Sequence, residues 1–393
     1  MKLAIITNLY PPYVRGGAEW LTYLISKELA LQGHQVAVIT SAPRSAIKNN
    51  SIEKVIEQGI AVYRFYPGNI YYYLDAVKRA KPIRLIWQII NLFNKSADRQ
   101  VKSILQDENP EVVITANLMG LSFRIPKVLR QLKIKHLHIV HDVQLLHPSG
   151  LFLVGKTDRG LAISIYQTIT RQLFSSPQTV IFPSNWLKQE HEQRKFFPNS
   201  NKLVVRNPAA LVSNMSSKPK SGNLVMLYVG QAEEHKGIFW LINVLKGIYD
   251  MEFKVELVLL GKTGDKERAR SLAKDDKRFV ISDHLAQDEI EKKYHEASVV
   301  IVPSLCQENL PLTIQRAFNH GTPVLASKVG GIPELVQEDK NGWLFKPGDE
   351  NDFRKKLVTI TPSLVRSMRD KIKNNYQAPT LPEYVGKLLT FFQ

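Results

Sequence analysis

The chain has 393 residues, more than a single core of roughly 250 to 300 residues can organise, so two domains are expected. Apolar residues make up 44% of it and no run of about 18 apolar residues occurs, which indicates a globular chain and excludes a membrane-spanning helix. The net charge is +17, and the single cysteine, Cys306, excludes an intrachain disulfide and a zinc site of cysteines; we expect a buried small hydrophobe there.

Short runs rich in Val and Ile alternate with helical stretches along the chain. The first, in "MKLAIITNLYPP", is interpreted as a strand start and not as a signal sequence, so a cytoplasmic location is expected. Continuous apolar runs of this length favour strands buried on both faces, and their alternation with helices predicts parallel sheets. The expected strands form two series, at 3–8, 35–40, 111–117, 136–142 and 179–184, and at 224–230, 255–261, 278–283, 298–304 and 323–327.

A glycine pair, Gly16 and Gly17, follows the first expected strand and opens a helix. Ligands of open parallel sheets bind beyond the carboxyl ends of the strands, where helix N-termini offer free N–H groups. Without Cβ atoms, the pair lets an anionic group approach the backbone closely. Taken alone it is weak evidence, because most such pairs only make a turn.

The positive charge is concentrated in the first half: residues 1–180 contain 22 Lys and Arg against 11 Asp and Glu. The stretch 71–93 mixes four basic residues with aromatic ones, which suits an anionic membrane surface. The alternative is a solvated helix face over a core stripe, and both interpretations stay open. No nucleic-acid-binding signature accompanies the charge, so nucleic acid is not expected as a partner. The residues concerned are Tyr71, Tyr72, Tyr73, Lys78, Arg79, Lys81, Arg84, Trp87 and Phe93.

Residues 207–223 are rich in Asn, Ser, Pro and Gly and have no periodicity, so they are interpreted as a linker. Beyond it, Lys236 and Gly237 stand between the first strand of the second series and a helix. A lysine there can neutralise a phosphate, although a surface lysine is the commoner case. The stretch "LGKTGD" at 260–265 lacks the glycine that a Walker phosphate loop requires five residues before Gly261.

Seven stretches in order carry a resemblance: "YPPYVRGGAEW", "GHQVAVIT", "IVHD", "FPSNWLKQEH" leading to "VVRNP", "VGQAEEHKG", "PSLCQENLPLTIQRA" and "GTPVLASKVGGIPELV". Over nearly its whole length the chain resembles the retaining glycosyltransferases of family 4. The resemblance implies the GT-B fold, two Rossmann-like parallel-sheet domains facing each other across a cleft. The acceptor-binding domain would be 1–206 with a C-terminal helix at about 376–393, and the donor-binding domain would be 224–375.

The resemblance also implies roles for individual residues. Gly16 and Gly17 match the glycine pair that faces the donor phosphates, and His141 matches the histidine beside the donor sugar. Lys236 matches the lysine that holds the diphosphate. Glu308 matches the first glutamate of a pair separated by seven residues, which contacts the donor sugar. The N–H groups that would lie near sugar and phosphate belong to Asn309, Leu310 and Leu312, while Pro311 has none.

Two positions depart from the family pattern. The second glutamate, which binds the ribose hydroxyls, would fall at Arg316, and the usual arginine after the strand-ending glycine is Gln231 here. The positive charge that the family has at position 231 is thus found at position 316 in this chain. Arg316 is therefore expected to reach a donor phosphate. The alternative is a helix-surface arginine paired with a neighbouring acid.

The expected function is transfer of a sugar from a nucleotide-diphosphate-sugar donor to a saccharide or lipid-linked acceptor, in surface polysaccharide or glycolipid synthesis. Fixed hydrogen-bond donors and a cation would stabilise the leaving diphosphate without a metal ion. The Asp-x-Asp pair used by metal-dependent glycosyltransferases does not occur in the chain. Neither a metal nor a cofactor is therefore expected. The expected location is the cytoplasm, with the inner face of the membrane as a peripheral site. Two alternatives stay open: a non-catalytic binding or scaffold subunit, favoured by Gln231 and Arg316, and a GT-B-type sugar-nucleotide epimerase.

Overall fold

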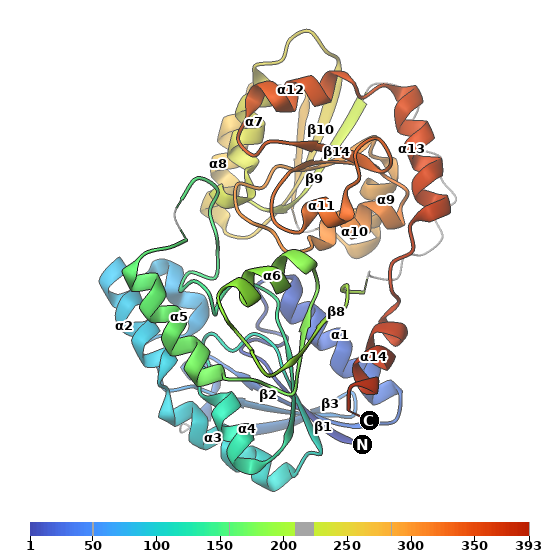
Figure 1. The fold of residues 1–393 in the computed structure, drawn as a ribbon. Helices are drawn as coiled ribbons and strands as arrows, with labels where there is room; N and C mark the ends of the chain where they lie inside the picture. The colour runs from blue at the N-terminus through green and yellow to red at the C-terminus, as the bar shows by residue number, and fades with distance from the viewer. Residues whose placement is uncertain (49–50, 157, 209–223, 284, 393) are drawn as a thin grey trace. The chain divides into compact units, whose positions relative to one another are not determined.

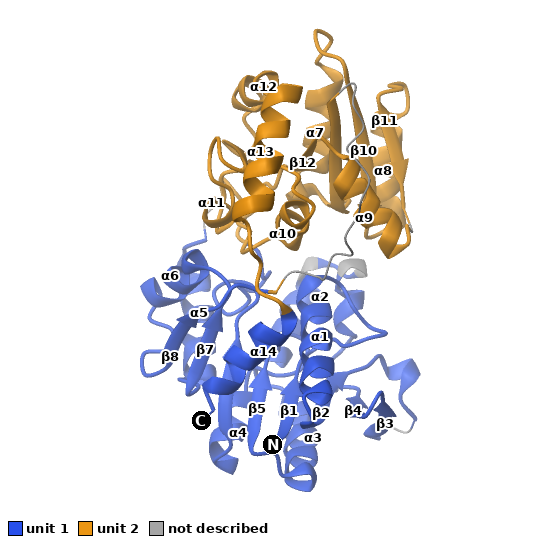
Figure 2. Ribbon diagram, turned by 90° about the vertical axis from the view of Figure 1, so that its right-hand side faces the viewer, with its two compact units in different colours: residues 1–151, 158–207, 381–393 blue, residues 152–157, 208–380 orange. Residues whose placement is uncertain are grey.

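The computed structural model describes residues 1–48, 51–156, 158–208, 224–283 and 285–392, which form two compact units (Figures 1 and 2). Unit 1 comprises 1–151, 158–207 and 381–393, and unit 2 comprises 152–157 and 208–380. The predicted linker lies outside the described residues except for 207 and 208. The segment 152–157, assigned from the sequence to the first domain, groups with unit 2 because its backbone pairs there.

Unit 1 is built on an eight-stranded sheet of order β3-β4-β2-β1-β5-β6-β7-β8 (Figure 1). Every neighbouring pair is parallel except β3 and β4, so the strand order reverses between β1 and β5. That reversal is the position at which ligands of open α/β sheets bind. The strands are β1 Lys2–Ile6, β2 Gln35–Ser41, β3 Glu53–Glu57, β4 Ile60–Phe65, β5 Val112–Thr115, β6 Lys135–Ile139, β7 Thr179–Phe182 and β8 Asn201–Val204.

The antiparallel pair β3 and β4 corrects the expectation of a purely parallel sheet. Gln58 and Gly59 connect the two strands, and both have positive φ, as a two-residue hairpin turn requires. The strand β3, "EKVIE", is largely exposed at the sheet edge and lacks the apolar run by which buried strands are recognised.

The helices of unit 1 bury one apolar stripe each. In α1, Leu21, Ile25 and Leu29 recur every four residues and enter the same core as β1 and β2. The C-terminal helix α14 packs beside α1 and adds Tyr384 and Leu388 to that core (Figure 2). It begins at Leu381, later than the predicted 376. The helices are α1 Gly17–Leu31, α2 Lys81–Leu92, α3 Lys95–Glu108, α4 Ile125–Leu132, α5 Leu161–Phe174, α6 Asn185–Gln193 and α14 Leu381–Thr390, with 3₁₀ turns η1 Arg44–Ala46 and η3 Tyr73–Lys78.

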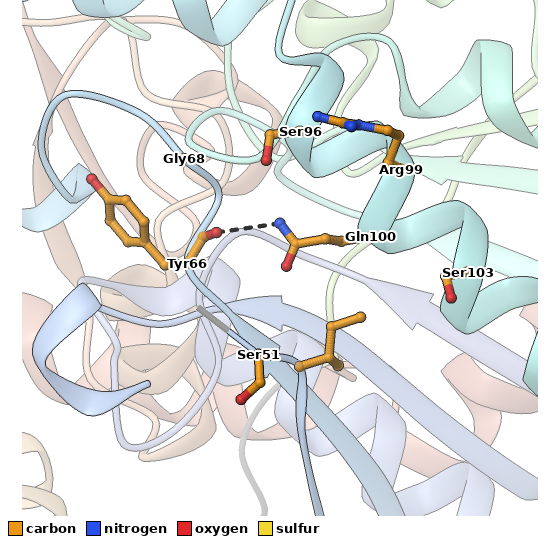
Figure 3. A pocket seen from close by; sticks show the side chains of 8 residues that line it. Ser51, Tyr66, Gly68, Ser96, Arg99, Gln100 and Ser103 are labelled. Atoms are coloured by element: carbon orange, nitrogen blue, oxygen red, sulfur yellow. Dashed lines mark hydrogen bonds between the residues drawn. The ribbon is translucent and has the colours of Figure 1, made fainter. Parts of the chain in front are cut away.

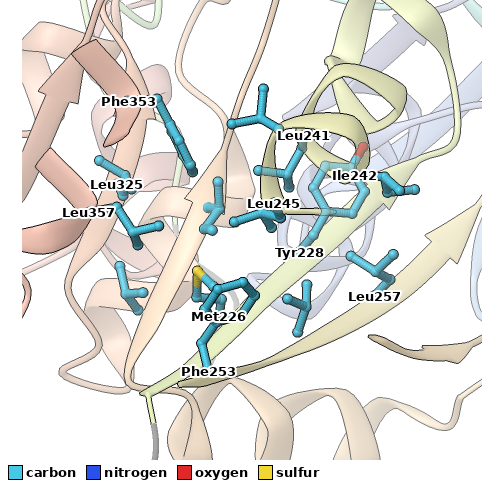
Figure 4. Packing of buried hydrophobic residues seen from close by; sticks show 14 of the residues in the cluster. Met226, Tyr228, Leu241, Ile242, Leu245, Phe253, Leu257, Leu325, Phe353 and Leu357 are labelled. Atoms are coloured by element: carbon cyan, nitrogen blue, oxygen red, sulfur yellow. The ribbon is translucent and has the colours of Figure 1, made fainter. Parts of the chain in front are cut away.

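Unit 2 has a six-stranded parallel sheet of order β11-β10-β9-β12-β13-β14, which reverses between β9 and β12. Its strands are β9 Leu224–Gln231, β10 Phe253–Leu260, β11 Phe279–Ser282, β12 Val299–Val302, β13 Val324–Ser327 and β14 Gly342–Phe345. Its helices are α7 Ile238–Lys246, α8 Thr263–Ala273, α9 Gln287–Glu296, α10 Leu312–Asn319, α11 Ile332–Leu335, α12 Glu350–Val358 and α13 Pro362–Asn375, with the 3₁₀ turn η4 Glu234–Lys236. Figure 4 shows strand residues such as Met226 and Leu257 meeting α7 and α12 through Leu241, Leu245 and Phe353 in one core.

Truncating a buried side chain of α14 tests how much the packing of this helix stabilises unit 1. Leu388 is 1% exposed, so Leu388→Ala leaves a cavity and is expected to lower the free energy of unfolding by about 2–5 kcal/mol. Lys387→Ala, at an exposed position of the same helix, is the control and should change little. Urea denaturation measures both; equal effects would show that α14 does not stabilise the unit.

Candidate functional site

The carboxyl ends of β9 and β12 bring Lys236 and Glu308 together in unit 2. Lys236 ends the η4 turn that follows β9, and Glu308 lies in the loop between β12 and α10. The Lys236 Nζ atom lies 2.7 Å from Glu308 Oε1, and Ser304 Oγ donates to the same oxygen at 2.8 Å. The predicted lysine and glutamate therefore form one ion pair at the strand-order reversal of the second sheet.

Each member of this pair keeps the other charged. Burial disfavours the ionised forms, yet the ammonium holds the pKa of Glu308 below its usual value and the carboxylate holds the pKa of Lys236 above its usual value. Burial also raises the pKa of the Cys306 thiol to about 12. Cys306 is 1% exposed, which confirms the expected burial, and its thiol donates to Glu308 Oε1 at 3.9 Å.

Two glycines allow the surrounding loops to approach one another. Gly237 has φ +74°, and a Cβ there would lie 1.8 Å from the carbonyl oxygen of Pro303. Gly330 has φ +52°, and a Cβ would lie 1.9 Å from the carbonyl oxygen of Glu308. The Gly331 N–H donates to that same Glu308 carbonyl at 2.9 Å. The stretch "GGIPEL" thus supports the backbone of Glu308.

A segment distant in sequence supports the same loop. Phe152 accepts a hydrogen bond from the Gln307 N–H at 2.7 Å, and the Val154 N–H donates to Leu305 at 3.0 Å. Leu153 forms an antiparallel bridge with Cys306 between these bonds. Sequence reasoning missed this contact because no pattern in three residues specifies a partner about 150 positions away.

Four more residues predicted to bind the donor lie at the carboxyl edge of the unit 2 sheet. Gln231 ends β9, Asn309 and Leu310 follow Glu308, and Leu312 begins α10. Thr313 Oγ1 donates to Val229 at 3.4 Å, which holds the start of α10 against the end of β9. Their roles toward a donor remain those that the resemblance implies.

The structure favours the interpretation of Arg316 as an arginine paired with a neighbouring acid. Its guanidinium donates through Nε to Glu291 Oε1 at 3.1 Å and also through Nη2, while His320 Nε2 contacts the second oxygen of Glu291. The side chain packs over the Tyr294 ring at 5.4 Å. Arg316 is therefore paired with a buried acid of α9, as the alternative interpretation expects, and its role toward a donor phosphate stays a prediction. Glu291 could not be recognised as the partner from sequence, because the two residues lie on different helices.

Unit 1 brings a second set of polar residues to its strand-order reversal. Gly16 precedes α1 and donates its N–H to Glu19 Oε2 at 2.8 Å, and Gly17 begins the helix. His141 follows β6, and burial lowers its pKa to about 4, so its imidazole is neutral at pH 7. The three residues predicted for this unit thus lie at its carboxyl edge.

Next to His141 stands an aspartate that sequence reasoning missed. Asp142 Oδ1 accepts the Gln144 N–H at 2.8 Å, and Asp142 Oδ2 accepts Asn117 Nδ2 at 3.3 Å. Burial raises the pKa of Asp142 to about 7; the Gln144 N–H opposes that shift and the Glu19 charge adds to it. The "IVHD" motif contains Asp142, but only the fold reveals its environment.

The aromatic residues of the basic stretch 71–93 are mainly core residues. Trp87 is 3% exposed, stacks on Tyr71 at 5.6 Å and donates its indole N–H to the Tyr71 carbonyl. Of the two interpretations that the sequence leaves open, these aromatic side chains fit the core stripe. What α2 exposes instead is aliphatic: Leu85, Ile86 and Ile89 are each more than half exposed. The side chains of Lys78 and Lys81 lie outside the described part of the structure.

A hollow of about 470 Å³ lies elsewhere in unit 1, between the loop after β4 and helix α3 (Figure 3). Ser51, Tyr66, Ser96, Arg99 and Gln100 line it, and Gln100 Nε2 donates to the Tyr66 carbonyl at 3.4 Å. None of the residues predicted for the site lines this hollow.

No group of three or more His, Cys, Asp or Glu among the described residues is arranged to hold a metal ion. No helix in the described ranges has both the length and the apolar character needed to cross a membrane.

The amino-acid sequences of both units match known protein families. The family model described as Glycosyltransferase Family 4 matches residues 15–211, and that described as Glycosyl transferases group 1 matches residues 223–361. An uncharacterized 42.6 kDa protein in the cps region of Klebsiella pneumoniae is 23% identical over 382 residues, 92% of this chain and 96% of its own. Lipopolysaccharide 1,2-N-acetylglucosaminetransferase of Salmonella typhimurium is 26% identical over 229 residues, 54% of this chain and 58% of its own.

The solved structure of Anabaena HepE in complex with UDP-glucose is similar over 99% of both chains, with a TM-score of 0.65 and 16% identity. At this identity the likeness concerns the fold alone. Together with the two parallel-sheet units it identifies the GT-B fold.

The Glu291 network yields a stability prediction. Glu291→Gln removes the charge that Arg316 and His320 share, and is expected to lower the free energy of unfolding by about 3 kcal/mol near pH 7. The pKa of Glu291 is lowered, since Arg316 and His320 outweigh the effect of burial. Its contribution is therefore present above the unfolded-state pKa and is lost as the pH falls through the folded-state pKa.

Denaturation at a series of pH values measures this difference, with Asp288→Asn on the exposed surface of α9 as the control. A difference that does not shrink on acidification would contradict the electrostatic explanation.

Proposed function

Because the chain belongs to glycosyltransferase family 4, we propose that it transfers a hexose from a nucleotide-diphosphate-sugar donor to a saccharide or lipid-linked acceptor. The proposal includes retention of the anomeric configuration and independence from metal ions. Unit 2 takes the donor and unit 1 takes the acceptor. Surface polysaccharide or glycolipid synthesis is the proposed context, supported by the cps-region protein of Klebsiella and the lipopolysaccharide transferase of Salmonella.

The observation that carries the proposal is the Lys236–Glu308 pair. Lys236 offers a cation at the strand ends where a departing diphosphate accumulates charge, so it stabilises the transition state more than the ground state. Glu308 Oε1 is occupied by Lys236 and Ser304. Its carboxylate has further acceptor capacity for a sugar hydroxyl. A diphosphate that binds Lys236 competes with Glu308 for the ammonium.

This competition distinguishes the two residues experimentally. Lys236→Ala is expected to weaken UDP binding by about tenfold or more, since a charge-assisted contact is lost. Glu308→Gln is expected to preserve or strengthen UDP binding, because it releases the ammonium, while lowering turnover of the nucleotide sugar. Calorimetry with UDP and GDP, and release of nucleotide from UDP- and GDP-sugars, measure the two effects; Lys274→Ala at an exposed site of unit 2 is the control.

The outcomes separate the alternatives. Nucleotide release that requires an acceptor supports the transferase, and NMR of the product anomer tests retention. Nucleotide binding without turnover would favour a binding or scaffold subunit, and sugar interconversion without acceptor would favour an epimerase. Glu308→Gln that weakens UDP binding as strongly as Lys236→Ala would contradict the competition.

We also propose that α2 places unit 1 on an anionic membrane surface. Leu85, Ile86 and Ile89 are 64%, 53% and 53% exposed, and Arg84 is exposed within the same helix. Apolar side chains beside basic ones are the composition of a helix that lies in the membrane interface. The basic residues add about 1 kcal/mol each, screened by salt.

Sedimentation with vesicles of acidic and of neutral lipid tests this contact. Leu85→Ser with Ile89→Ser is expected to weaken binding to acidic vesicles by at least about tenfold, because each buried side chain contributes about 1.5–3 kcal/mol. Val358→Ser, which removes an equally exposed side chain from α12, is the control. Unchanged binding of the double variant would leave α2 as an ordinary surface helix.

A further inference from the structure

We propose that Asp142 is the residue of unit 1 that binds the acceptor, by accepting a hydrogen bond from the hydroxyl to be glycosylated; this inference rests on the proposed function. The observation behind it is the position of the carboxyl group. Asp142 lies just beyond the carboxyl end of β6, beside the reversal between β1 and β5 and next to His141. Ligands of open α/β sheets bind at that edge.

A buried network fixes the carboxyl group in place. Asn117 is 6% exposed and Gln144 is 4% exposed, and both contact the Met119 N–H through their side-chain oxygens, at 3.1 and 2.9 Å. The Tyr166 hydroxyl donates to the Gln144 carbonyl at 2.6 Å. The two groups that donate to Asp142 are thus held in place by hydrogen bonds of their own residues. A carboxylate has about four acceptor sites, so two donors leave capacity for a ligand hydroxyl.

The groups that face Asp142 come from several elements. The charges of Arg15, just before α1, and of Glu19, in its first turn, influence the pKa of Asp142. The charge of Asp142 in turn adds to the effect of burial in raising the pKa values of Tyr73 of η3 and Tyr166 of α5. Glu19 is committed to the Gly16 N–H. His141 is neutral at pH 7. Of the two carboxylates in this group, Asp142 is therefore the one suited to receive a hydroxyl.

Holding an ionised aspartate here costs folding stability. Because burial raises its folded-state pKa to about 7, the folded protein binds the proton more tightly than the unfolded chain does. Stability then falls as the pH rises from the usual aspartate pKa to about 7. Strongly shifted pKa values cluster at functional sites, so this cost supports the assignment made from the position and the contacts of Asp142.

The first experiment uses stability and needs no substrate. Asp142→Asn keeps the size of the side chain and removes the charge, so it is expected to raise the thermal unfolding midpoint at pH 8 and to flatten its dependence on pH between 4 and 8. Asp107→Asn, at an exposed position of α3, is the control and should shift neither. If Asp142→Asn lowers the midpoint at pH 8, the carboxylate is a structural group and the inference is wrong.

The second experiment uses turnover of UDP-glucose, UDP-galactose and UDP-N-acetylglucosamine, with methyl glycosides of glucose, galactose and N-acetylglucosamine or water as acceptor. Asp142→Asn is expected to lower turnover by about tenfold or more and to change the KM for the donor by less than about twofold. In the natural protein the acceptor KM should rise as the pH falls below about 7, because the protonated acid accepts poorly; the variant should lose this dependence. An unchanged turnover or an unchanged pH profile in the variant would overturn the inference.

The experiments distinguish failure of the proposed function from failure of the inference about Asp142. If the natural protein binds none of the nucleotides, the transferase proposal fails, while the stability experiment still decides whether Asp142 carries a charge that the fold does not need.

Discussion

Parallel sheets bring the carboxyl ends of all their strands to one edge, and the candidate site residues of this chain depend on that constraint. In unit 2, the ends of β9 and β12 bring Lys236 and Glu308 to 2.7 Å although they are 72 positions apart. In unit 1, the ends of β5 and β6 bring Asn117 to Asp142. The helices and cores position these strand ends, and the loops beyond them carry the chemistry.

The two units treat a buried acid in opposite ways. Glu308 has a lysine partner, so its pKa lies below the usual value and its charge is compensated before any ligand binds. Asp142 has amide donors, and burial outweighs them, so its pKa is about 7. The same principle, desolvation against local stabilisation, therefore gives a fixed anion in one unit and a titratable acid in the other. This difference is what the proposed function requires, a donor site of constant charge in unit 2 and an acceptor site in unit 1 that receives a hydroxyl.

Much of the fold could be predicted from the sequence, because apolar runs and helical stretches are local signals. All ten expected strands lie within or overlap strands of the structure. Strands β3, β4, β8 and β14 were not among those expected, and of these β3 is exposed and has no apolar run. The bridge of Leu153 to Cys306 was missed because pairing between residues so far apart in the sequence leaves no local pattern. The ion pair of Arg316 with Glu291 was left open for the same reason. The environment of Tyr71 and Trp87 was left open because an aromatic residue beside a basic one suits a membrane face and a core equally well.

Hydrogen–deuterium exchange with and without UDP, and in parallel GDP, tests the central claim that the donor binds at the strand ends of unit 2. The account predicts that the effective nucleotide protects the η4 turn around Lys236 and the loop from Ser304 to Leu312, and leaves the hollow at Tyr66 and Arg99 unchanged. Protection at that hollow, or no protection around Lys236 with a nucleotide shown to bind, would contradict it.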